Sequence, residues 1–530
     1  MDPVQAGNAV FNFLEVHPWI LITLIAHGAI LGAVAYLILL ERKIASWVQD
    51  RIGPNRVGLG FGIIPFLKDK HMFGLGQPLA DGLKFILKED YQPKGVDKYL
   101  FTAAPMMMII VVIISIAVLP WGGIKQTTRD VDVASWNQGQ KPSDVDSWVP
   151  DKVKSEIPID GTTFFADKPG EKAEDHITKR VEDVQDSDGV WREHLIAKIT
   201  YRYNFQSASL NIGVLFVLAA LSLAVYGVVI GGWASNNKYS FLGGLRATAN
   251  MISYEIPLGL AVLCVVVVFG TLNLEDLVNK QAYGIFSWNI WSQPFAFVMF
   301  LVCIHAEANR APFDMAEAEQ ELVGGYHTEY SAMRFALFFL GEYAGMITTS
   351  VVCIALFFGG WQFPGVDRLT TWIVNLCITH GHLPSELARW DPQNPAVTNS
   401  LVVCIVRALV LFTKTIAVIF VFMWVRWSLP RFRFDQLMNL AWRGLIPISL
   451  ALLMVTAIIV YIFGGAPDPG QALPARTIIA LGLTNVAMLV VSVVVGAKLP
   501  AIGTNRKMKI PNSRFTKTPL PAGVSVASNN

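Results

Sequence analysis

The 530-residue sequence has few charged residues, few cysteines and no excess of one charge sign. Only 15% of its residues are charged, whereas soluble domains carry about 25%. The five cysteines form no Cys-x-x-Cys pair, which argues against a disulfide framework, a zinc site or an iron–sulfur cluster held by this chain. No histidine pair has metal-ligand spacing, and a net charge of +2 offers no basic surface for nucleic acid. We therefore expect neither a metal site nor nucleic-acid binding.

Long hydrophobic runs are abundant instead, and 53% of the residues are hydrophobic. A soluble protein this apolar would expose patches that aggregate, and a bilayer needs about 20 apolar residues for each helix that crosses it. We predict an all-α polytopic membrane protein with eight core transmembrane helices, a ninth near the C-terminus and an interfacial amphipathic helix. The predicted spans are 19–40, 101–120, 210–232, 251–270, 293–306, 331–358, 400–424, 445–463 and 477–498.

Lysine and arginine concentrate after the first span, after the seventh span and in the tail after the ninth. With nine spans and the N-terminus outside, all three basic segments lie in the cytoplasm, as does the C-terminus. The predicted organisation is 1–120 with the first two spans and a cytoplasmic segment between them, 121–205 as an extended outer loop, 206–463 with spans three to eight and an acidic cytoplasmic loop at 307–330, and 464–530 with the additional helix and a basic cytoplasmic tail.

Three acidic residues lie at membrane depth: Glu255 and Glu342 inside predicted spans, and Glu307 at the end of one. A charged side chain near the bilayer centre costs about 2.5–3.5 kcal/mol on insertion scales. Such residues face a hydrated interior, pair with a base or carry protons; alternatively, each lies near a helix end and reaches interfacial water. Arg407 and Lys414 are seven residues apart, hence on one helical face, and are the expected basic partners.

A second acidic segment runs from Glu307 to Glu321. Pro312 suits the first turn of a helix, on which Asp314, Glu317 and Glu321 would share one face. Carboxylates that repel one another in this way have raised pKa values when they are desolvated, which suits proton transfer. The alternative is an acidic solvated helix, but such helices usually interleave basic residues and here only Arg310 is near.

The segment after the first span is amphipathic. Glu41-Arg-Lys closes the span, and Arg51-Ile-Gly-Pro-Asn-Arg56 forms a turn. The helix that follows carries Leu79, Leu83, Ile86 and Leu87 on one face and Asp81, Lys84 and Lys88 on the other. This pattern predicts a helix in the membrane interface, which can frame a mouth through which a hydrophobic ligand enters.

These segments resemble the H subunit of NADH-quinone oxidoreductase (respiratory complex I), the bacterial equivalent of mitochondrial subunit 1. The matching motifs are Glu41-Arg-Lys, Arg51-x-Gly-Pro-Asn-Arg56, Gln77-Pro-Leu-Ala-Asp81-Gly-Leu-Lys84, Trp233-Ala-Ser-Asn236, Ile252-Ser-Tyr-Glu255, Glu307-x-Asn-Arg-x-Pro-Phe-Asp314 and Pro430-Arg-Phe-Arg-Phe-Asp435. The resemblance implies a subunit that forms part of the quinone cavity and couples quinone reduction to proton translocation through buried carboxylates.

The resemblance also implies roles by position. The residues implied to line the quinone cavity or its mouth are Glu41, Arg42, Arg51, Asp81, Arg310, Asp314 and Glu317. Those implied to form the acidic proton path are Glu255, Glu307, Glu319, Glu321 and Glu342, beside the basic Arg407 and Lys414 expected above. Arg426, Arg431 and Arg433 would lie where the hydrophilic arm docks.

Under this resemblance the chain works as part of an enzyme without a redox centre of its own. Quinone is the substrate, and flavin and iron–sulfur clusters belong to partner chains. The partners would be hydrophilic-arm subunits, small and antiporter-like membrane subunits, and lipid of the cell inner membrane. Two alternatives remain open. One is the equivalent subunit of a ferredoxin- or coenzyme-F420-linked dehydrogenase or of a membrane-bound hydrogenase; the other is a secondary transporter, which predicts an inverted internal repeat that we do not find in the sequence.

Overall fold

The computed structural model describes residues 18–58, 72–137, 177–185, 191–204, 206–208, 210–282, 284–315, 323–363, 401–464 and 473–498. Each of the nine predicted spans coincides with a helix in these ranges. The helices are α2 (Pro18–Val48), α4 (Lys98–Ala117), α6 (Gly213–Ala234), α7 (Lys238–Phe269), α10 (Pro294–Glu307), α12 (Ala332–Phe357), α15 (Leu401–Ser428), α17 (Ile446–Phe463) and α18 (Ala475–Lys498). Seven helices in the described ranges are long and apolar enough to cross a membrane, which confirms an all-α polytopic membrane protein, whereas the number of eight core helices plus a ninth stays a prediction.

The chain divides into two units, residues 1–486 and 487–530. The second unit is described only where α18 ends, over residues 487–498, and this part is helical. All remaining elements belong to the first unit, which holds every candidate site residue that the structure describes.

Capping side chains set several of the helix boundaries. The Asp97 carboxylate accepts hydrogen bonds from the backbone amides of Tyr99 and Leu100, at 3.1 and 3.2 Å, and so begins α4. Asn237 caps α7 in the same way, and Gly270 ends it with a left-handed backbone (φ 68°). Helix α7 therefore begins well before the apolar run from which its span was predicted.

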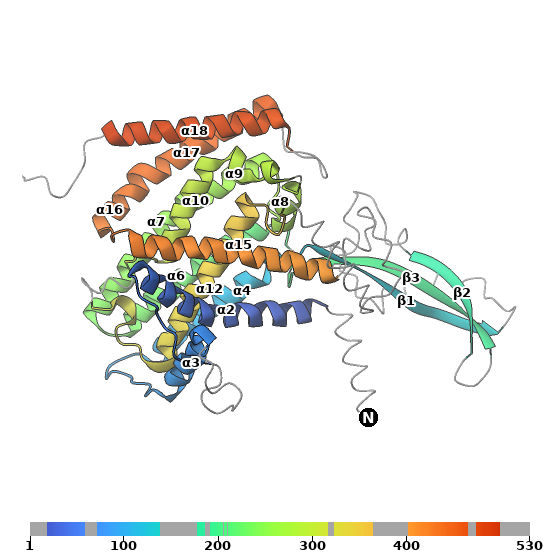
Figure 1. Cartoon of the computed structure of the whole chain (residues 1–530), viewed down its shortest axis with the longest axis horizontal. Coiled ribbons are helices and arrows are strands. Elements are labelled where there is room, and N and C mark those ends of the chain that lie inside the picture. Colours follow the sequence, from blue (N-terminus) through green and yellow to red (C-terminus); the bar gives the residue numbers. More distant parts are fainter. Residues whose placement is uncertain are drawn as a thin grey trace, which may run out of the picture. The chain divides into compact units, whose positions relative to one another are not determined.

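Helix α12 is the most enclosed of the seven. In its apolar membrane-spanning stretch 72% of the residues are buried, whereas the share is 44% in α4 and 28% in α15. It runs beside α2 and α15 (Figure 1). Helices α6 and α7 pack closely at Gly232. A Cβ atom at this position would lie 2.7 Å from the Ser240 carbonyl oxygen, so only glycine fits there without a shift. A central α12 flanked by other helices places its polar residues inside the protein.

Short elements connect the long helices. They are η2 (Met72–Gly74), α3 (Gln77–Leu87), α8 (Leu274–Lys280), η4 (Ile285–Ser287), α9 (Asn289–Ser292), η5 (Gly325–His327), α16 (Phe434–Asn439) and the π-helix η7 (Leu440–Leu445). Helix α3 has no buried residue, and its leucine and isoleucine side chains at 79, 83, 86 and 87 are all exposed. An uncovered apolar face of this kind is typical of a helix at the membrane interface.

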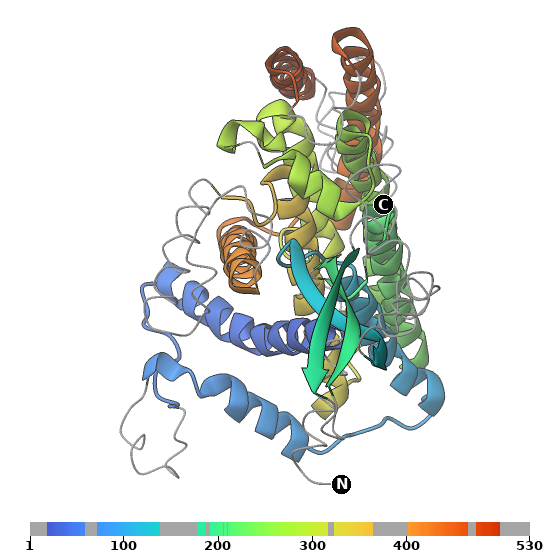
Figure 2. The ribbon, with the colours of Figure 1, turned by 90° about the vertical axis from the view of Figure 1, so that its right-hand side faces the viewer.

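The segment predicted as an extended loop contains a three-stranded antiparallel sheet. Strands β1 (Ile124–Asn137), β2 (Ile177–Gln185) and β3 (Trp191–Asn204) have the order β1-β3-β2, and the ribbon is twisted (Figure 2). Thr128 pairs with Thr200 and Val181 with Leu195, and the β1 register shifts between Asp132 and Ala134. These strands are not evident from the sequence, because their side chains are mostly polar and few apolar positions reveal the alternation of a strand.

Candidate functional site

Four charged side chains meet in the interior: Glu41 from α2, Arg310 from the loop after α10, Glu342 from α12 and Arg426 from α15. We call them the ionic cluster. The Arg310 Nε atom lies 2.9 Å from a Glu342 oxygen, and its Nη1 atom lies 3.5 Å from Glu41. Arg426 forms an ion pair with the same Glu41 carboxylate. Glu41 and Arg310 are only 6% and 3% exposed, so the two cations and two anions compensate each other where water contributes little.

Tyr343 completes the cluster and was not predicted as a site residue. Its hydroxyl donates a hydrogen bond to the Glu41 carboxylate. The Arg310 guanidinium stacks over its ring, 4.2 Å from the centroid. A tyrosine inside an apolar run is ordinary in a membrane helix, and its position directly after Glu342 was the available clue in the sequence.

Asp314 is buried and forms a further ion pair, with Arg431 at 2.7 Å. Asp314 is 2% exposed, whereas the Arg431 side chain is about one-third exposed. The helix predicted to begin at Pro312 is wrong for the described residues, since 308–315 form turns in which the Phe313 amide donates to the Arg310 carbonyl. Ion pairs made by Arg310 and Asp314 with distant elements override the local helix preference.

The remaining residues predicted for the quinone cavity lie near the end of α2. Arg42 forms an ion pair with Asp81 of α3 at 2.7 Å, and Gln77 donates to the same carboxylate at 3.0 Å. Arg51 is exposed, and its backbone amide donates to the Ser46 carbonyl. Glu317, Glu319 and Glu321 lie outside the described residues, so the structure brings together only part of the predicted set.

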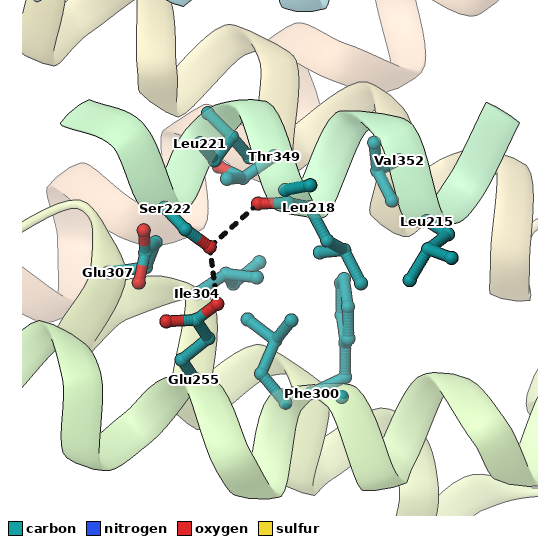
Figure 3. Close-up of a pocket in the computed structure, with 13 residues that line it drawn as sticks. Leu215, Leu218, Leu221, Ser222, Glu255, Phe300, Ile304, Glu307, Thr349 and Val352 are labelled. Carbon is teal, nitrogen blue, oxygen red and sulfur yellow. Dashed lines mark hydrogen bonds between the residues drawn. The ribbon is translucent and has the colours of Figure 1, made fainter. Parts of the chain in front are cut away.

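Two cavities lie beside the acidic residues of the spans. The larger, of about 230 Å³, is bounded by α6, α7, α10 and α12 and is lined by Glu255 and Glu307 together with mostly apolar side chains. Figure 3 shows Ser222, Glu255 and Glu307 gathered at one end of it, with Leu215 and Val352 at the other. The smaller, of about 40 Å³, is lined by Glu307, Glu342, Asn309 and Thr349 among others.

Glu307 lines both cavities, with Glu342 in the smaller one and Glu255 in the larger. A water molecule occupies about 30 Å³ in the liquid, so the larger cavity has room for several. Carboxyl groups separated by spaces of this size can exchange protons through water. The arrangement is thus a row of three carboxyl groups that begins at the ionic cluster.

Lys414 does not pair with this row as the sequence analysis expected. Its ammonium group donates to the carbonyl oxygens of residues 358, 360 and 362 at 2.6–2.8 Å and lies 4.4 Å from the centroid of the Trp288 ring. An ammonium group has three hydrogens. Three carbonyls therefore satisfy it, and the expected carboxylate pairing is wrong.

Arg407 acts electrostatically on Glu275, an acidic residue that the sequence analysis missed. Glu275 lies in α8, outside the spans, and is 4% exposed. Burial and the charge of Asp276 raise its pKa to about 8, against the opposing charge of Arg407. Glu275 escaped notice because its burial comes from tertiary packing and no hydrophobic run contains it.

The three arginines predicted at the docking surface differ in surroundings. Arg426 belongs to the ionic cluster and Arg431 holds Asp314, whereas Arg433 is exposed at the start of α16. Within the described ranges, we find no group of three histidine, cysteine or acidic side chains that could hold a metal ion.

Comparison with known proteins gives consistent matches. A family profile described as NADH dehydrogenase matches residues 21–137 and 194–457. The unmatched interval 138–193 contains β2 and the start of β3. Three curated relatives, each named as the H subunit of NADH-quinone oxidoreductase, come from Flavobacterium johnsoniae (35% identical), Cytophaga hutchinsonii (36%) and Koribacter versatilis (37%). These alignments cover 79%, 80% and 81% of this chain and 88%, 91% and 93% of the respective relatives.

Proposed function

The chain belongs to the family of the H subunit of NADH-quinone oxidoreductase, and from this membership we propose that it forms part of the quinone-binding cavity of that enzyme. We propose further that it couples quinone reduction to proton translocation through its buried carboxylates. As a subunit of the oxidoreductase it has an enzymatic role without a redox centre of its own. Flavin and iron–sulfur clusters are then held by partner chains of the hydrophilic arm.

The proposed cavity lies around the ends of α2 and α12. The residues that would line it or its mouth are Glu41, Arg42, Arg51, Asp81, Arg310, Asp314 and Glu317. Support comes from the buried charges of the ionic cluster and from α3, which is joined to α2 by the Arg42–Asp81 pair and leaves its apolar face uncovered. A hydrophobic quinone would enter past the apolar face and meet polar groups deeper inside.

The observation that carries the coupling proposal is the position of Glu307 in the walls of both cavities. Reduction of quinone to quinol takes up two protons and changes the charge beside the ionic cluster. Arg310 is shared by Glu41 and Glu342, so a change in the charge of one alters the field at the other. Glu342 would pass this change to Glu307 and Glu307 to Glu255, with Glu319 and Glu321 in the same path.

The partners follow from the same proposal. Hydrophilic-arm subunits would dock on the cytoplasmic side at Arg426, Arg431 and Arg433. Small and antiporter-like membrane subunits would continue the proton path laterally from Glu255. The protein would lie in the cell inner membrane with its N-terminus outside and its C-terminus in the cytoplasm.

The test replaces Glu307 by glutamine in the assembled complex, in membrane vesicles that report quinone reduction and proton translocation. Because glutamine keeps the shape but cannot ionise, we expect translocation to fall by about a hundredfold or more, the scale typical of a lost proton-transfer group. Glu193→Gln, on β3 and outside the lining of both cavities, serves as the matched control. Wild-type rates and a wild-type proton-to-electron ratio in Glu307→Gln and in Asp314→Asn would refute the proposal.

A further inference from the structure

Ser222 is a polar residue of the larger cavity to which the proposed path assigns no role. It lies on α6, and its hydroxyl oxygen contacts two oxygens at once (Figure 3). One is the carbonyl oxygen of Leu218, at 2.9 Å on the same helix, and the other belongs to the Glu255 carboxyl group on α7. The serine therefore joins the helix backbone to a carboxyl group of the proposed path.

A serine hydroxyl has one hydrogen, whereas both of its partners accept hydrogen bonds when Glu255 is ionised. When Glu255 is protonated, the acid can donate to Ser222 while Ser222 donates to the Leu218 carbonyl, and all three groups are satisfied. When Glu255 is ionised, the hydroxyl can turn and donate to the carboxylate, and Leu218 keeps its ordinary helical hydrogen bond. The same two contacts thus serve both protonation states.

We propose that Ser222 is a positioning residue for proton transfer at Glu255. Its hydroxyl accepts from the protonated acid, donates to the carboxylate, and holds the side chain at the cavity wall through both states. The inference rests on the proposed function, because it concerns the passage of protons through Glu255.

The surroundings of the pair favour this role. The rest of the cavity wall is largely apolar, and a hydrogen bond to a charged group is stronger where water is scarce. Thr349, also in the wall, directs its hydroxyl to the carbonyl oxygens of Gly345 and Met346 on its own helix. Ser222, by contrast, reaches across from α6 to a carboxyl group on α7.

A purely structural serine is available as a control. The Ser115 hydroxyl in α4 donates to the Val111 carbonyl at 2.8 Å, which is the same four-residue backbone contact that Ser222 makes with Leu218. Ser115 is fully buried and is not part of the walls of the two cavities described above. Ser115→Ala therefore removes a matched hydroxyl whose described contact is with backbone.

The experiment compares four variants in the assembled complex: Ser222→Ala, Ser222→Thr, Ser115→Ala and Glu255→Gln. Each rate is divided by the amount of assembled complex. Proton translocation is measured together with the redox-induced infrared difference spectrum, in which the band lost in Glu255→Gln reports the Glu255 carboxyl group. In Ser222→Ala we expect translocation to slow by about tenfold, which corresponds to about 1.4 kcal/mol of activation free energy. We also expect the carboxyl band to move to higher wavenumber, because its hydrogen bond is lost. Ser222→Thr, which keeps a hydroxyl, should restore both readouts.

The outcomes separate this inference from the proposed function. If Glu255→Gln is inactive while Ser222→Ala keeps the wild-type rate and band, the inference is wrong and the proposed function stands. If Glu255→Gln keeps the wild-type rate, the proposed function itself fails at this residue. Equal losses in Ser222→Ala and Ser115→Ala, with an unmoved band, would overturn the inference in favour of packing. Should Ser222→Ala fail to assemble, Ser222→Cys takes its place; its weak donor should give an intermediate rate, and a wild-type rate would overturn the inference.

Discussion

Arg310 and Glu342 form a buried ion pair, with the guanidinium Nε atom 2.9 Å from a carboxylate oxygen. Arg310 also faces Glu41 on α2, so one cation is shared between carboxylates of two different helices. Such an arrangement transmits electrostatic change in either direction without any large movement. It also makes the fold around the site sensitive to the loss of a single charge.

Glu41→Gln removes the charge that Arg310 and Arg426 share, and Tyr343→Phe removes only a hydroxyl that Glu41 accepts from. We expect losses of about 3–5 kcal/mol for the former and about 1–3 kcal/mol for the latter. Thermal unfolding of the assembled complex, followed through this chain, measures both. Tyr226→Phe, on the exposed side of α6, is the control, and a loss in Tyr343→Phe no larger than in that control would exclude a contribution from the hydroxyl.

Arg42 and Asp81 should contribute to substrate binding more than to stability. Their side chains are 49% and 24% exposed, and an exposed ion pair contributes about 0–1 kcal/mol. If they line the quinone mouth, Asp81→Asn raises KM for quinone and leaves the unfolding temperature almost unchanged. Titration of quinone reduction against quinone concentration tests this. A large fall in unfolding temperature with an unchanged KM would mean that the pair only anchors α3.

Lys414 should prove structural. In Lys414→Met, the carbonyls of residues 358, 360 and 362 lose a shared donor beside Trp288. Since buried polar groups without a partner are costly, we expect a loss of about 2–5 kcal/mol. The amount of assembled complex should fall, while the protons translocated per electron stay unchanged in the complex that remains. A lower ratio with normal assembly would instead place Lys414 in the proton path.

The raised pKa of Glu275 predicts that the stability of the protein depends on pH. The native protein holds this proton up to about pH 8, whereas an ordinary glutamic acid side chain releases it near 4.5. Between these values the native state binds more protons than the unfolded state, so stability falls as pH rises. In Glu275→Gln this part of the slope should vanish, and unfolding temperatures measured from pH 5 to 8 should be flatter than in the wild type. An equally steep slope in Glu275→Gln would contradict the prediction.

The spans were predictable because their cause is local. A run of about 20 apolar residues needs a helix in a bilayer whatever its neighbours are, and each predicted run coincides with a helix among the described residues. Partners within the site were less predictable. The acidic residues Glu255, Glu307 and Glu342 stood out against apolar sequence, but the tyrosine that binds Glu41 comes from 302 positions further along the chain.

Two errors have the same origin. The helix expected at Pro312 was inferred from local preference, and the carboxylate partner of Lys414 from spacing on one helical face. Arg310 instead finds partners on distant helices, Asp314 pairs with Arg431 between α15 and α16, and Lys414 meets carbonyls just after the end of α12. Contacts between residues so far apart in the chain produce no periodic pattern in a single sequence. The β1–β3 sheet was missed for a different reason, since its strands carry too few apolar side chains to show a period of two.

Helix α3 has no buried residue, and its described links to the neighbouring helices include the Arg42–Asp81 pair and a ring contact between Phe85 and Phe335. The position of α3 in the protein thus depends on what covers its exposed leucine side chains. Delipidation in a harsh detergent should loosen this helix first, while the packed spans stay folded. If α3 frames the quinone mouth as proposed, a preparation that has lost quinone affinity after extraction would regain it on return to nanodiscs, without any refolding of the core.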